Sequence, residues 1–165
     1  MSRRGALLGL VMALSCLAVG ASAADARLTF ERPDGSTVRF AGPPRVWCGP
    51  WEPDVANRSV HVRLRNEKRV WDLSAVRRDV ELGQPIEFPN GFVWNKPHGA
   101  LLFAAYSRNE ASTAEEESSG SMTFSGVSCR RDGVVAFSID AVLGSEFIDG
   151  DLVKVTGTFS GRMEK

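Results

Sequence analysis

The stretch GVVAFSIDAVLGS, residues 133–145, carries an apolar side chain at every second position. These apolar residues are Val135, Phe137, Ile139, Ala141 and Leu143. Residues two apart lie on the same face of a β-strand, so the pattern predicts one long strand with one buried face.

Two similar segments flank this strand, GSMTFSGVSC over 120–129 and LVKVTGTFSGRM over 152–163. Turn-forming residues separate the three segments, so the C-terminal region is predicted to be a three-stranded antiparallel meander. Gly126 and Gly157 fall inside the predicted strands, where glycine often marks a bulge or a kink.

The N-terminal half repeats the strand pattern. ARLTFERPDGSTVRF, over 26–40, has a Pro-Asp-Gly turn between two alternating runs, and SVHVRLRNEKRVWDL, over 59–73, has the same organisation. Both are predicted to be hairpins. GALLFAAYS, over 99–107, predicts a buried strand, and the polar segment 109–120 predicts a mobile acidic loop. We therefore expect one all-β domain over residues 24–165, an antiparallel β-sandwich or a barrel-like variant of it.

Residues 1–23 have the pattern of a secretory signal peptide. Two arginines precede an uncharged apolar run that ends in Ala-Ser-Ala at 21–23. We expect export to the periplasm or the extracellular space. Cys16 loosely fits a bacterial lipoprotein site, so the alternative is a lipid anchor at Cys16, which would hold the protein on a membrane.

The charged residues are balanced. The chain has 20 basic and 20 acidic side chains, and removal of the signal peptide leaves a small acidic excess. This balance argues against general nucleic-acid binding.

Two cysteines, Cys48 and Cys129, follow the signal peptide. An isolated pair in an oxidising compartment is typical of a disulfide. Cys48 lies in VWCGPW, which differs from a thioredoxin active site because Trp51 stands where the second thiol belongs. A redox site needs both thiols, so we expect a disulfide; a thiol-redox protein is the alternative.

Three of the four tryptophans are candidates for binding. Trp47, Trp51 and Trp94 lie in or beside predicted turns, where they can stack on sugars, anchor a partner or plug the ends of the sandwich. His61, Arg63 and Arg65 project from one strand face and could hold an anionic polymer, or form an ordinary solvated face. The expected ligand surface comprises Trp47, Trp51, Trp94, Arg63 and Arg65.

The sequence contains no Gly-x-Ser-x-Gly, His-Glu-x-x-His or phosphate-binding glycine loop. We therefore expect no catalytic residue, metal or cofactor. The alternative is an exported hydrolase whose site is assembled from loops and includes His61 or His98.

The C-terminal half, SMTFSGVSC, VVAFSIDAVLGSEF and LVKVTGTFSG, resembles segments of small exported bacterial β-rich proteins and lipoproteins of uncharacterised function. The resemblance implies export and an all-β fold, and it carries no catalytic residues. We expect a non-enzymatic envelope protein that binds a protein or a cell-envelope polymer.

Overall fold

A computed structural model of the chain describes residues 25–39, 44–50, 58–66, 69–90, 99–106, 109–145 and 152–164. Within them the chain forms eleven strands and one short 3-10 turn, η1 (Arg77–Asp79). Each strand pairs antiparallel with its neighbours. The expected all-β sandwich is therefore confirmed. The predicted signal peptide and Cys16 lie outside the described residues.

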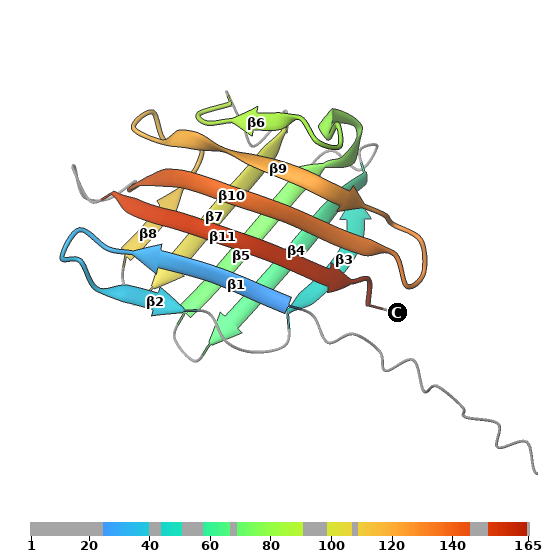
Figure 1. The fold of residues 1–165 in the computed structure, drawn as a ribbon, viewed down its shortest axis with the longest axis horizontal. Coiled ribbons are helices and arrows are strands. Elements are labelled where there is room, and N and C mark those ends of the chain that lie inside the picture. The colour runs from blue at the N-terminus through green and yellow to red at the C-terminus, as the bar shows by residue number, and fades with distance from the viewer. Residues whose placement is uncertain are drawn as a thin grey trace, which may run out of the picture.

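Two sheets pack face to face, and their strands run across one another (Figure 1). The front sheet contains, in spatial order, β2 (Thr37–Arg39), β1 (Asp25–Glu31), β11 (Val153–Arg162), β10 (Val134–Ser145), β9 (Ser119–Val127) and β6 (Pro85–Glu87). The rear sheet contains β8 (Asn109–Ser112), β7 (Ala100–Tyr106), β5 (Arg69–Val76), β4 (Arg58–Asn66) and β3 (Arg45–Pro50).

The sheets are joined on two sides. At one side, Gly144 and Ser145 at the end of β10 pair with β8 of the rear sheet. At the other, the backbone N–H of Glu164 donates to the carbonyl of Val46 on β3 at 2.7 Å. These links fix the rear sheet against the C-terminal strands.

The core lies between the sheets and contains the predicted apolar face of residues 133–145. All five alternate residues of that face are buried: Val135, Phe137, Ile139, Ala141 and Leu143. The ring of Phe137 lies 5.1 Å from Phe159 and 6.0 Å from Trp71 of the rear sheet, measured between centroids. Aromatic side chains thus bridge the two layers, where burial of large apolar groups stabilises most.

Both predicted hairpins are present. In the first, β1 pairs with β2, and Gly35, at φ 76°, donates its N–H to the carbonyl of Arg32 at 2.9 Å. In the second, β4 pairs with β5, and Asn66 faces Arg69 across the turn. The register of β9 on β10 shifts next to Gly126, as expected for a bulge.

The prediction of an acidic loop over residues 109–120 is wrong at both ends of the segment. Asn109–Ser112 form β8, and the last two residues of the segment belong to β9. Ala111 is buried, which ties the segment to the core. The Ser118 hydroxyl donates to the Ser112 carbonyl at 2.8 Å and accepts from the Gly144 N–H at 3.1 Å. These hydrogen bonds fix the connection between the two strands.

Candidate ligand-binding surface

Two rows of side chains cross the outer face of the rear sheet. Trp47 on β3 lies opposite His61 on β4, which lies opposite Ser74 on β5. In the next row, Arg63 of β4 lies opposite Asp72 of β5. Neighbouring residues on a strand point to opposite faces, so Trp47 faces outward while Cys48 packs against the core. We call Trp47, His61, Arg63, Arg65, Asp72 and Ser74 the Trp47 surface.

Trp47 is stacked on this face and partly exposed. Its ring lies 5.1 Å from the His61 ring, with an angle of 18° between the planes. The guanidinium carbon of Arg63 lies 5.7 Å from the Trp47 ring centre, within the range of a cation–π contact. The other aromatic side chains whose surroundings the structure describes are buried, namely Phe30, Trp71, Phe88, Phe124, Phe137 and Phe159.

Arg63 and Asp72 form a two-pronged ion pair. Arg63 Nε donates to Asp72 Oδ1 at 2.6 Å, and Arg63 Nη2 donates to Asp72 Oδ2 at 2.8 Å. The hydrogen bond to Asp72 raises the pKa of Arg63 above its usual value. Because two hydrogen bonds to one carboxylate hold it, the guanidinium has a fixed orientation.

The imidazole of His61 is held on two sides. Its Nδ1 lies 2.8 Å from the Ser74 hydroxyl, and the backbone of Gly49 accepts a hydrogen bond from the ring. With the proton of the neutral ring on Nε2, Nδ1 would accept a hydrogen bond from the Ser74 hydroxyl. Burial lowers the pKa of His61; the charge of Asp72 opposes this, and that of Arg63 adds to it.

A hydroxyl that donates to imidazole is also the arrangement of a serine nucleophile and its base. Here, however, Ser74 lies within β5, which pairs with β4 on one side and β7 on the other. The backbone N–H groups around Ser74 are used in these ladders, so none forms an oxyanion hole. Both oxygens of Asp72 accept from Arg63. The geometry fits a rigid polar surface better than a catalytic triad.

Of the other predicted surface residues, Arg65 is exposed on β4, two positions from Arg63 on the same face. Trp51, Trp94 and His98 lie outside the described residues. The surface that the structure shows is therefore assembled from three strands rather than from loops.

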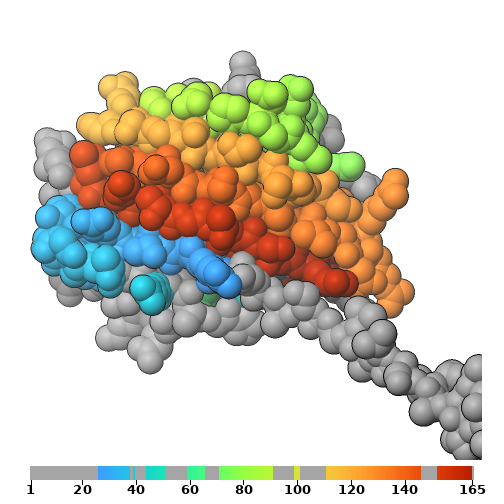
Figure 2. Space-filling view, in the orientation of Figure 1, coloured from blue at the N-terminus to red at the C-terminus, as the bar shows by residue number. Residues whose placement is uncertain are grey.

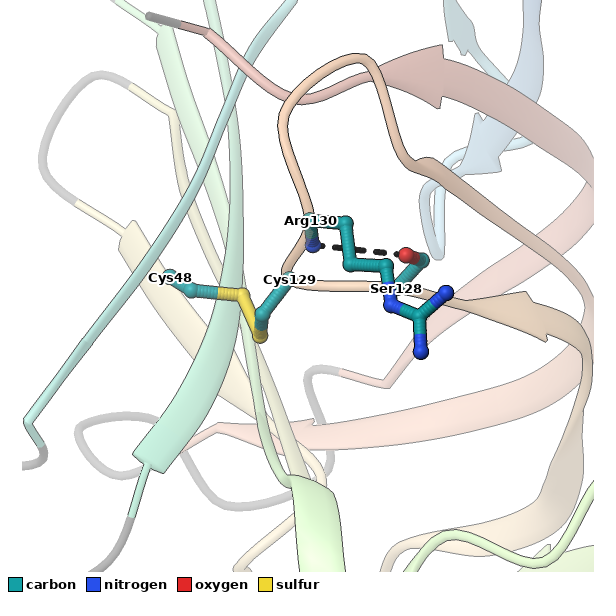
Figure 3. Close-up of a disulfide and its surroundings, with 4 residues drawn as sticks. All are labelled: Cys48, Ser128, Cys129 and Arg130. Carbon is teal, nitrogen blue, oxygen red and sulfur yellow. Dashed lines mark hydrogen bonds between the residues drawn. A yellow bond between two sulfur atoms is a disulfide. The ribbon is translucent and has the colours of Figure 1, made fainter.

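The expected disulfide is present and joins Cys48 of β3 to Cys129, which follows β9 (Figure 3). The two Cα atoms are 5.6 Å apart, within the usual range for a disulfide. The Arg130 N–H donates to the Ser128 hydroxyl at 3.3 Å beside it. Cys48 therefore has a structural partner.

Asp72 and Ser74 were not predicted from the sequence, although both complete the surface. Their partners follow from the register of the second hairpin, since a turn closed by Asn66 and Arg69 brings Arg63 opposite Asp72 and His61 opposite Ser74. The signal in the sequence was therefore the length of this turn, which decides which residues of β4 and β5 face each other.

The outer face of the front sheet has a different chemistry. Figure 2 shows β1, β11, β10 and β9 packed side by side as one continuous surface. Its middle rows hold small hydroxyl side chains, among them Thr29, Thr156, Thr158, Ser138, Ser121 and Thr123. Within the described part of the chain, this face has no aromatic side chain. The rear sheet therefore carries the better candidate surface.

Comparisons of the chain with models of protein families, with curated protein sequences and with solved structures found no match. In the part of the chain that the structure describes, no helix is long and apolar enough to span a membrane. Among those same residues, the side chains of His, Cys, Asp and Glu form no group of three that could hold a metal ion.

Proposed function

We propose that the protein is exported and acts as a non-enzymatic binding protein of the cell envelope, with the Trp47 surface holding an envelope glycan. The observation that carries the proposal is the partly exposed Trp47 ring on the outer face of the rear sheet, beside fixed hydrogen-bonding groups. Indole faces pack on the apolar faces of sugar rings, while the surrounding polar groups bind hydroxyls. The N-terminal segment and the disulfide are compatible with an oxidising compartment outside the cytoplasm.

The test is co-sedimentation of the purified protein with bacterial peptidoglycan sacculi from which attached protein has been removed. The native protein should sediment with them, and Trp47→Ala should reduce retention at least about tenfold, since a central tryptophan often dominates an interface. Lys154→Ala on the outer face of the front sheet is the matched control and should bind normally. Near-ultraviolet circular dichroism checks that each variant is folded.

Equal retention of the native protein and Trp47→Ala would overturn the proposal. Retention only on sacculi that still carry attached protein would also overturn it, because the bound partner would then be a protein. Mass spectrometry of the mature chain tests export: a start at residue 24 or an acylated Cys16 supports it, and an intact signal segment contradicts it.

An exported hydrolase is the second candidate, and the contact between Ser74 and His61 is what favours it. A fluorophosphonate probe that labels the native protein but not Ser74→Ala would favour that candidate over a binding protein.

A further inference from the structure

The ion pair of Arg63 and Asp72 leaves hydrogen-bonding capacity for a ligand. A guanidinium has five N–H donors, and Asp72 occupies Nε and one position on Nη2. The remaining donors lie next to carboxylate oxygens that still have free lone pairs. Donors and acceptors fixed side by side match the paired hydroxyls of a sugar, which both donate and accept. A bare phosphate at this point would face the negative charge of Asp72.

Arg65 adds a charge that is not neutralised on this surface. It is exposed, and it forms no ion pair with any residue that the structure describes. Arg63 is paired with Asp72, and Arg45, at the other edge of the face, is paired with Glu164 at 3.1 Å. Among the described side chains of this face, Arg65 is therefore the cation that is available to an anionic ligand.

The aromatic and cationic ends of the surface are separated along β4. His61, which supports Trp47, and Arg65 are four residues apart, about 13 Å along a strand. This span is longer than a single sugar ring. A glycan that reaches both ends must therefore contain more than one sugar and lie along β4.

We propose, building on the glycan-binding function above, that the Trp47 surface is specific for an anionic glycan. One sugar stacks on Trp47, a second places its hydroxyls on Arg63 and Asp72, and a carboxylate or phosphate of the chain binds Arg65. Carboxylated and phosphorylated glycans share the required chemistry, since each offers oxygens that accept charge-assisted hydrogen bonds from a guanidinium.

Binding of three soluble polymers, measured by isothermal titration calorimetry at low salt, tests the proposal: neutral dextran, polygalacturonate and poly(glycerol phosphate). The native protein should bind at least one of the two anionic polymers about tenfold more tightly than dextran, as expected for a hydrogen bond between charged groups. Arg65→Gln should reduce that affinity to the level of dextran. Preference for polygalacturonate identifies a carboxylate, and preference for poly(glycerol phosphate) identifies a phosphate.

Lys154→Gln, which removes an exposed cation from the opposite face, should leave all three affinities unchanged. Equal reduction by Lys154→Gln and Arg65→Gln would mean unspecific attraction of polyanions and would overturn the proposal. Equal affinity for dextran and the anionic polymers would also overturn it. If the affinities for dextran and the anionic polymers were equal, Trp47→Ala would decide about the glycan-binding function. Loss of dextran binding in Trp47→Ala would support that function, and unchanged dextran binding would contradict it as well.

Discussion

At the scale of single residues, His61 links the Trp47 surface to pH. Its ring is packed between Trp47 and Ser74, and burial lowers its pKa from the ordinary value of 6.5. The folded protein therefore takes up this proton at a lower pH than the unfolded chain. Arg63 favours the neutral ring, whereas Asp72 favours the charged one.

We expect the free energy of unfolding to fall as the pH is lowered from about 7.5 to 5.5, because the unfolded chain gains the His61 proton first. His61→Gln should show a smaller decrease over the same range. Urea denaturation of both proteins at several pH values measures the difference. His98, the second histidine of the chain, is present in both proteins, so parallel pH profiles would contradict the assignment to His61.

At the scale of elements, β11 depends on a glycine where it passes β1. Gly157 has φ 139° and pairs with Leu28 on one side and Ile139 on the other. A Cβ atom at this position would overlap the carbonyl oxygen of Arg27. The close approach of the two strands therefore requires the absence of a side chain.

Gly157→Ala should destabilise the protein by at least about 3 kcal/mol, because backbone atoms on β1 cannot move aside without breaking the ladder. Gly35→Ala is the matched control. Gly35 also has a positive φ, 76°, but a Cβ there would meet nothing within 4 Å. That change should cost about 1 kcal/mol. Chemical denaturation measures the free energy of unfolding of both variants. Equal losses would show that the backbone conformation of Gly157, rather than the contact with the Arg27 carbonyl, explains the effect of its substitution.

The elements also show which features the sequence could predict. Alternation identified the long strands because each buries one complete face, as in residues 133–145. It missed β6, which has three residues and begins at Pro85, and β8, which pairs with β7 and β10 through tertiary contacts. Short strands carry too few alternating residues to be distinguished from loops.

The candidate surface was predictable only in part, for a related reason. Trp47 was predicted from its residue type beside a turn, and Arg63 and Arg65 were predicted from strand parity. Asp72 and Ser74 depend on the register between strands, and a shift of one residue would have placed both on the buried face.

At the scale of the whole molecule, the disulfide and the hydrogen bond from Glu164 to Val46 hold the two sheets together at β3. Cys48 and Cys129 are separated by 81 residues in sequence. The link therefore restricts a large part of the unfolded chain. Trp47 precedes Cys48, so the same link anchors the strand that carries the ring.

Replacing both cysteines, Cys48→Ser with Cys129→Ser, should lower the free energy of unfolding by about 4 kcal/mol, mainly because the unfolded chain gains freedom. Urea denaturation of the variant and of the reduced native protein should give similar values. A variant as stable as the oxidised native protein would contradict a structural role for the disulfide.

The outermost strands bear on how the molecule behaves at high concentration. β2 and β6 have three residues each, and prolines lie in two of the outer strands, Pro50 in β3 and Pro85 in β6. A proline offers no N–H to an incoming strand, and a three-residue edge offers few partners. Growth of either sheet by addition of a second molecule is thereby opposed. If the proposed glycan brings many copies of the protein close together, these outer strands would oppose their joining edge to edge into fibres.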